Sequence, residues 1–72
     1  MNLLKILEEE LQRWGEVIIR TASGATFELH RGDTKIDHEN QIIRFKSADA
    51  EWVIDGKSLE VLKMHWSHPE EA

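Results

Sequence analysis

The spacing of apolar residues divides the chain into a short helical part and a longer alternating part. Over the first fifteen residues, apolar side chains recur every three or four positions, which places them on one face of a helix. These residues are Leu4, Leu7, Leu11 and Trp14. Asn2 is a suitable N-cap, and Gly15 stands where the helix should end. The pattern predicts an amphipathic helix within residues 1–15.

After residue 15 the apolar residues alternate with polar ones, which is typical of strands with one buried face. We expect strands over 16–21, 25–30, 41–47 and 50–55, in antiparallel order. Turn-forming residues separate them at Ser23-Gly24, 37–40 and 47–49. Arg31-Gly32-Asp33 is either a bulge or a bend in a long second strand that resumes at Thr34.

The segment from Ala50 to Trp66 is the most apolar part of the chain and is expected to organise the rest. Trp52 and Ile54 should point to one side of a strand and Val53 to the other. Asp55-Gly56 then predicts a tight turn, because these residues tolerate a positive φ. Both Trp52 and the helical Trp14 are expected to be buried.

Residues 58–66 suit either a strand or a short helix. Leu59, Leu62 and Trp66 have helical spacing, with a serine as N-cap. We favour a strand because the preceding elements already form an antiparallel series. As a strand, the segment needs a bulge or burial of both faces, since the apolar side changes between Val61 and Leu62.

Together these elements predict one mainly β (α+β) domain. It consists of an N-terminal helix (1–15), a small barrel (16–66) made from a strongly bent five-stranded antiparallel sheet, and a flexible tail (67–72).

The composition restricts the class of protein. A 72-residue chain has a core near the lower limit for independent stability, and without cysteine it lacks disulfides, so self-association is an expected source of stability. The absence of cysteine, of a secretory signal and of an apolar span predicts a cytoplasmic protein with no membrane contact. A net charge of −5 disfavours binding to a phosphate backbone.

The sequence contains no convincing catalytic set, and we expect neither enzymatic activity nor a cofactor. It has no cysteine nucleophile, glycine-rich phosphate loop or nucleophile elbow. His65 and His68 would come together as metal ligands only on a helix, and on a strand they point to opposite sides. We therefore predict no metal site and keep a histidine site as an alternative.

Several residues are expected on the surface, where they can contact partners. Arg44 and Lys46 fall on outward strand positions and form either a small basic strip that would contact a nucleic acid or part of a solvated face of mixed charge. Ile42 and Val53 are expected to be exposed and to join an oligomer interface. Trp66 either covers the end of the barrel or anchors a partner subunit.

Two local patterns and the order of elements resemble the Sm-like fold of spliceosomal Sm proteins and the bacterial host-factor RNA chaperone, a small SH3-like barrel. Asp37-His38-Glu39-Asn40 is similar to that family's aspartate-to-asparagine turn but is one residue shorter. Ile54-Asp55-Gly56-Lys57 is similar to its final turn, with Asp55 in the place of an arginine. The resemblance implies that Asn40 and Gly56, with Lys57 beside them, would contact a uracil and its phosphate.

From these observations we expect a non-enzymatic interaction module that forms a homo-oligomer and binds a protein partner of unknown identity. Sm-like binding of single-stranded RNA is the first alternative, and a histidine-based metal site is the second.

Overall fold

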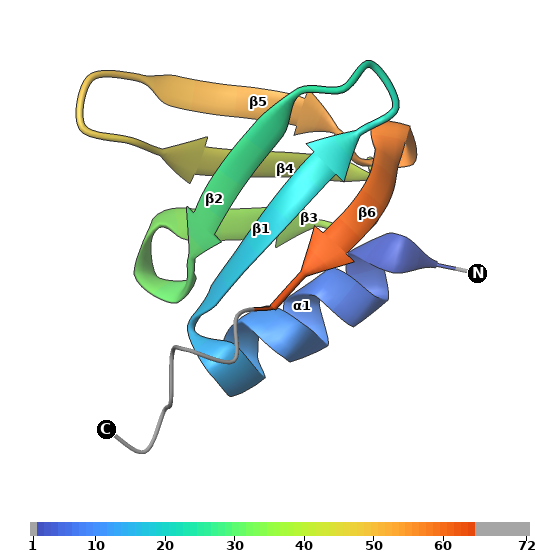
Figure 1. The fold of residues 1–72 in the computed structure, drawn as a ribbon, viewed down its shortest axis with the longest axis horizontal. Helices are drawn as coiled ribbons and strands as arrows, with labels where there is room; N and C mark the ends of the chain where they lie inside the picture. Colours follow the sequence, from blue (N-terminus) through green and yellow to red (C-terminus); the bar gives the residue numbers. More distant parts are fainter. Residues whose placement is uncertain (1, 65–72) are drawn as a thin grey trace.

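The computed structural model describes residues 2–64, which form one helix and six strands in two three-stranded antiparallel sheets (Figure 1). The regular elements are α1 (Leu3–Trp14), β1 (Glu16–Thr21), β2 (Thr26–His30), β3 (Thr34–Asp37), β4 (Ile42–Lys46), β5 (Glu51–Asp55) and β6 (Leu59–Lys63). Two single 3-10 turns, η1 (Arg31–Asp33) and η2 (Gly56–Ser58), connect β2 to β3 and β5 to β6.

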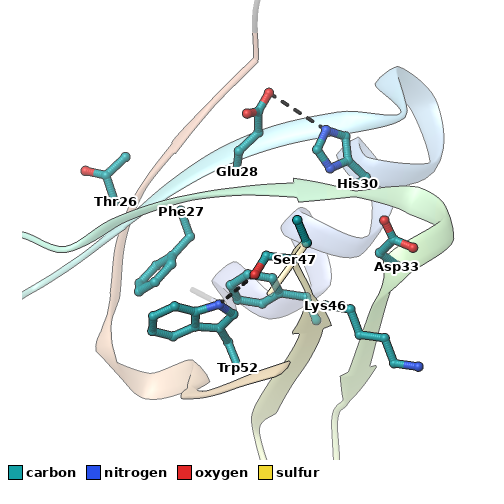
Figure 2. A pocket seen from close by; sticks show the side chains of 10 residues that line it. Thr26, Phe27, Glu28, His30, Asp33, Lys46, Ser47 and Trp52 are labelled. Carbon is teal, nitrogen blue, oxygen red and sulfur yellow. Dashed lines mark hydrogen bonds and ion pairs between the residues drawn. The ribbon is translucent and has the colours of Figure 1, made fainter. Parts of the chain in front are cut away.

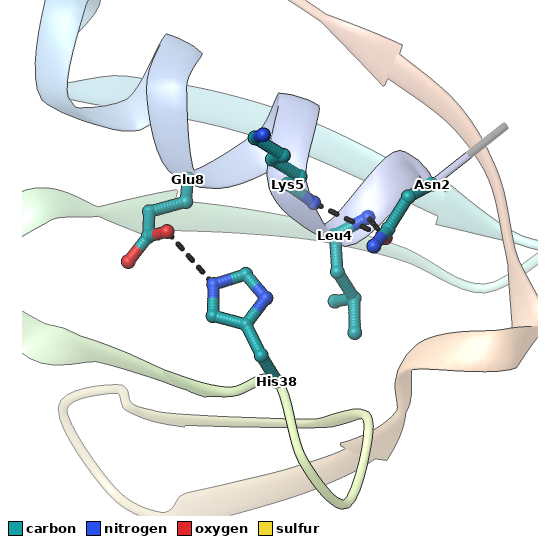
Figure 3. Close-up of polar contacts among 5 residues, drawn as sticks. All are labelled: Asn2, Leu4, Lys5, Glu8 and His38. Atoms are coloured by element: carbon teal, nitrogen blue, oxygen red, sulfur yellow. Dashed lines mark hydrogen bonds and ion pairs between the residues drawn. The ribbon is translucent and has the colours of Figure 1, made fainter.

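Helix α1 begins and ends as its sequence predicts. The side chain of Asn2 accepts hydrogen bonds from the backbone N–H groups of Leu4 and Lys5, at 3.1 and 3.3 Å (Figure 3). Gly15 ends the helix in the left-handed region, with φ 83°, and its N–H donates to the carbonyl of Leu11 at 2.8 Å. The predicted helix is therefore confirmed, with both of its caps.

The apolar face of α1 contributes to a core shared with both sheets. Leu4, Leu7 and Leu11 are at most 3% exposed, and the helix packs against β1 and β6 (Figure 1). The buried strand residues are Val17, Ile19, Leu29, Ile43, Phe45, Ile54 and Leu59. They alternate with exposed or half-buried residues along β1, β2 and β4, which confirms the period-two prediction for these strands.

The strands form two sheets, with orders β2-β1-β6 and β3-β4-β5, where the sequence predicted five strands in one curled sheet. The ladder between β1 and β2 ends where Glu16 faces His30, because β1 offers no residue beyond that pair. The N–H of Arg31 donates to the carbonyl of Gly15 at 3.0 Å, and η1 then turns the chain into the second sheet. The expected bend at 31–33 thus separates two strands.

Residues 59–63 form a strand, as predicted. Val61 and Leu62 are both half-buried, in agreement with the expected burial of both faces, and the register contains a bulge one residue before Val61. Thr21 faces Leu59 and Arg20 faces Val61, which leaves Glu60 as the extra residue in the register. β6 pairs with β1, whereas β5 pairs with β4, so the two strands joined by η2 belong to different sheets.

The predicted tight turn at Asp55-Gly56 is wrong in its conformation. Within residues 2–64, positive φ angles occur at Gly15, Gly24 and Gln41, and Gly56 is not among them. Glycine is needed at 56 for space, because a Cβ there would come within 2.7 Å of Leu4 Cδ1 and 2.9 Å of the Gln41 carbonyl oxygen. The sequence pattern identified the residue but not the reason for it.

The tryptophans are less buried than the sequence predicted. Trp52 is 42% exposed, because it lies directly after the turn into edge strand β5, where Phe27 and Phe45 cover only part of its ring. Trp14 is half-buried, and its indole N–H donates to Glu10 Oε1 at 2.9 Å.

Candidate interaction surface

An open groove of about 620 Å³ lies between β2 and the β4–β5 hairpin (Figure 2). Its lining residues are Thr26, Phe27, Glu28, His30, Asp33, Phe45, Lys46, Ser47, Ala48 and Trp52. Aromatic rings occupy its inner part, and charged side chains of both signs surround them. The sequence analysis did not identify this groove, because it assigned Trp52 to the core.

Three aromatic rings form the apolar part of the groove. The ring of Phe27 lies 5.6 Å from that of Phe45 in an edge-on arrangement and 5.3 Å from that of Trp52. Phe45 and Trp52 are nearly parallel, at 10°, with centroids 6.2 Å apart. The Trp52 indole N–H donates to Ser47 Oγ at 3.2 Å (Figure 2). These contacts fix the orientation of the indole while part of its ring stays in contact with water.

The edge strand β5 carries an exposed apolar pair. Val53 is 55% exposed and Trp52 is 42% exposed, and they are the exposed large hydrophobic residues of the described chain. In the described structure β5 pairs with β4 alone, so the backbone groups on its other side are open to a further strand. Exposure of Val53 agrees with the prediction from its strand position.

The other two residues expected at an oligomer interface have different outcomes. Ile42 is half-buried, which corrects its assignment as an exposed residue. Its strand β4 is the central one, and Asp37 and Asp55 flank it on the two sides. Trp66 lies outside the described residues.

Arg44 and Lys46 lie on the outward face of β4, as predicted. Lys35 faces Arg44 across the β3–β4 ladder, and Glu51 faces Lys46 across the β4–β5 ladder. The basic side chains therefore share this face with at least one carboxylate, which favours the mixed-charge description over a continuous basic strip.

The turn between β3 and β4 holds Asn40 through Asp37. The backbone N–H of Asn40 donates to Asp37 Oδ1 at 3.1 Å, and its side-chain Nδ2 donates to Asp37 Oδ2 at 2.9 Å. The side-chain hydrogen bond is the main reason that the pKa of Asp37 is lowered from its ordinary value, and the backbone N–H adds to the effect. The amide of Asn40 thus stabilises its own turn.

The β3–β4 turn meets η2 through a backbone hydrogen bond, because the Gly56 N–H donates to the Gln41 carbonyl at 2.7 Å. Asp55 caps η2, since its side chain accepts from the Lys57 N–H at 2.9 Å. A second hollow of about 400 Å³ forms here and is lined by Asn2, Leu3, Leu4, Gln41, Gly56, Lys57 and Leu59. Gly56 and Lys57 are therefore brought together at one hollow, and Asn40 is adjacent in sequence but is not part of its lining.

The two histidines within the described residues both lie near carboxylates. His38 Nε2 lies 2.7 Å from Glu8 Oε1, which links the β3–β4 turn to the exposed side of α1 (Figure 3). His30 lies on β2, beside Glu16 and Glu28. His65 and His68, the candidate metal ligands from the sequence, lie outside the described residues.

Two further findings bear on identity. None of the helical structure in residues 2–64 has the length and apolar character required to cross a membrane. The comparisons with known proteins were all negative: no protein-family model, no curated protein and no solved structure matches this chain.

Proposed function

We propose that this domain is a non-enzymatic interaction module that self-associates through the open edges of its two sheets. The observation that carries the proposal is the edge of β5, where an unpaired strand side coincides with the exposed residues Trp52 and Val53. A free strand edge is a template for another strand, and natural domains that stay monomeric usually protect it with charge, proline or a bulge. Val53 is an apolar residue at the position where such protection would be most effective.

The expected gain from covering this edge is moderate. Full burial of a large apolar side chain contributes about 1.5–3 kcal/mol, so covering the exposed parts of Trp52 and Val53 is worth roughly 2 kcal/mol. A strand added to β5 also forms main-chain hydrogen bonds, which supply affinity in known cases of strand addition. A small domain with no disulfide gains most from such an association.

We also propose that the domain has an Sm-like fold. The support is the connectivity: a helix precedes the strands, β2 and β3 are two parts of one bent segment, and η2 carries the last strand back to β1. In that arrangement the strand edges remain available for ring or dimer assembly.

A charge placed on the edge of β5 tests self-association. We expect the wild-type chain to form a defined oligomer at micromolar concentration in light scattering with size-exclusion chromatography. Val53→Lys should shift it to the monomer, because lysine on an edge strand opposes pairing. Gln12→Lys is the matched control, since it adds the same charge on an exposed helical position and should leave the oligomer intact.

Two results would contradict the proposal. One is a wild-type chain that stays monomeric at micromolar concentration. The other is equal dissociation in both variants, which would mean that net charge and not the β5 edge controls the association.

Binding of single-stranded RNA is a second candidate, and the meeting of the β3–β4 turn with η2 favours it. The hydrogen bond between Gly56 and Gln41 places Lys57 beside the turn that holds Asn40, and the side chain of Lys57 is exposed. Asp55 counts against a phosphate at this position, although its carboxylate already accepts the N–H of Lys57.

A short uridine-rich strand is the appropriate probe for this candidate. We expect the wild-type chain to bind this strand with an affinity that decreases as salt is added, and Lys57→Gln to bind it more weakly than the wild type. Lys63→Gln, at the end of β6, is the control and should bind as the wild type does. If no mobility shift occurs at low ionic strength, or if both variants lose binding equally, the turns are not an RNA site.

A further inference from the structure

We propose that Glu16, Glu28 and His30 bind one divalent transition-metal ion of the zinc type on the outer face of the β2-β1-β6 sheet. One ligand atom from each side chain lies within 4.8 Å of the other two. His30 Nε2 is 4.0 Å from Glu16 Oε2 and 3.8 Å from Glu28 Oε2. Figure 2 shows Glu28 and His30 directed toward each other from neighbouring positions on β2.

The β1–β2 ladder fixes this arrangement. Glu16 directly faces His30 in the register, and Glu28 lies two residues before His30 on the same strand face. The tight turn at Ser23-Gly24 joins the two strands, and Gly24 has the positive φ of 94° that it needs. All three side chains therefore project from paired strands, which position ligands more precisely than loops do.

The separation of these atoms is that of ion pairs, and it also leaves space for a bound ion between the side chains. Distances of 3.8 and 4.0 Å exceed those of hydrogen bonds. His38 and Glu8, in contrast, approach to 2.7 Å. Zinc bonds to nitrogen and oxygen of about 2.0–2.1 Å in a tetrahedral site place ligand atoms roughly 3.4 Å apart. The two distances from His30 Nε2 to the carboxylates therefore need to close by about half an ångström.

The chemistry of the donors selects the class of metal. An imidazole nitrogen favours zinc and its neighbours in the first transition row over magnesium or calcium, which prefer oxygen ligands. Two carboxylates and a neutral imidazole carry a charge of −2, which a divalent cation neutralises. Three protein donors leave a fourth position for water, as in zinc sites that are open to a further ligand.

Burial of one ligand strengthens the site electrostatically. The side chain of Glu16 is 14% exposed, whereas those of Glu28 and His30 are each 52% exposed. A largely covered carboxylate beside a second carboxylate lies in a medium of lower effective dielectric than water, where a divalent cation is attracted more strongly. The two exposed ligands provide the route by which the ion enters.

Titration of the full chain with zinc chloride, followed by calorimetry near neutral pH, tests the proposal. We expect one zinc ion per chain with micromolar affinity, and no binding of magnesium. Mutation of a residue that only hydrogen-bonds to a metal ligand typically lowers metal affinity by about tenfold or more. Removal of a ligand itself should cost at least as much, so His30→Ala and Glu28→Gln should each bind zinc at least about tenfold more weakly. Both residues are exposed, and circular dichroism should show that the two variants keep the fold.

The other histidines of the chain offer matched controls for the His30 variant. His38→Ala removes the other histidine of the described structure that lies beside a carboxylate, and it should leave zinc affinity unchanged. The double variant His65→Ala/His68→Ala should also retain binding. Zinc should raise the melting temperature of the wild type by mass action and should not raise that of His30→Ala. Absence of zinc binding, unchanged affinity in His30→Ala and Glu28→Gln, or loss only in the His65/His68 variant would overturn the assignment.

Discussion

Replacement of Gly56 by alanine tests the packing at the junction of α1, the β3–β4 turn and η2. An added Cβ would lie 2.7 and 2.9 Å from the two terminal carbons of Leu4 and 2.9 Å from the Gln41 carbonyl oxygen. Leu4 is 3% exposed and has little freedom to move, and the carbonyl belongs to the backbone. We therefore expect the Gly56–Gln41 hydrogen bond to be strained or broken.

The size of the effect follows from two contributions. Overpacking of a filled core costs typically 1–3 kcal/mol, and loss of a hydrogen bond costs about 1 kcal/mol, so Gly56→Ala should lower the free energy of unfolding by about 2–4 kcal/mol. A domain of this size is stable by roughly 4–11 kcal/mol. Each kcal/mol lost from the free energy of unfolding lowers the melting temperature by about 4–8 °C in a domain of this length, so the melting temperature should fall by roughly 10–30 °C.

Two other glycines separate packing from backbone conformation. A Cβ added to Gly32 would have no atom of the described residues within 4 Å, and Gly32 has no positive φ, so Gly32→Ala should be neutral or slightly stabilising. Gly24 also has open space but a φ of 94°, so Gly24→Ala should cost about 1 kcal/mol through strain alone. In thermal and urea unfolding, Gly56→Ala should lose the most stability, Gly24→Ala should lose less, and Gly32→Ala should lose the least. If Gly56→Ala is as stable as Gly32→Ala, the packing argument is refuted.

Two further predictions concern hydrogen bonds at the ends of elements. Asn2→Ala should lower the free energy of unfolding by about 0.5–2 kcal/mol in urea unfolding, because the first N–H groups of α1 lose their acceptor, and Asn2→Asp should restore most of the loss. The hydrogen bonds from Asn40 lower the pKa of Asp37 in the folded state. The ionised carboxylate therefore stabilises the fold at pH values above the ordinary pKa of aspartate, and this stabilisation is lost as the pH falls from the ordinary pKa to the lowered pKa. Between about pH 5 and pH 2, stability measured by thermal unfolding should therefore fall less steeply in Asp37→Asn than in the wild type, and equal slopes would contradict this assignment.

Much of the fold follows from local patterns that compete little with tertiary structure. The spacing of Leu4, Leu7 and Leu11 specifies the helix face, and alternation specifies the inward residues of β1 and β4. The change of apolar side between Val61 and Leu62 indicated a bulge or burial of both faces, and these two residues are both half-buried. In each case a residue's neighbours along the chain contain the information.

The misassigned features depend on which strands meet. The separation into two sheets follows from the length of β1, which ends the β1–β2 ladder at His30. Trp52 has the alternation of a core residue, and its exposure depends on β5 being an edge strand. The proposed metal ligands also depend on pairing between strands, because a hairpin turn at Ser23-Gly24 places Glu16 opposite His30, and residues so far apart in the sequence form no local motif.

The pairing of β1 with β6 affects how the chain folds during synthesis. Helix α1 and strand β1 leave the ribosome before β6, but both pack against it. Closing so long a loop is entropically costly and slow, so Ile19 lacks its neighbour Leu62 until residues 59–63 emerge. Nascent chains that end before β6 should consequently be targets for chaperones and proteases, and emergence of β6 should allow the β2-β1-β6 sheet to form.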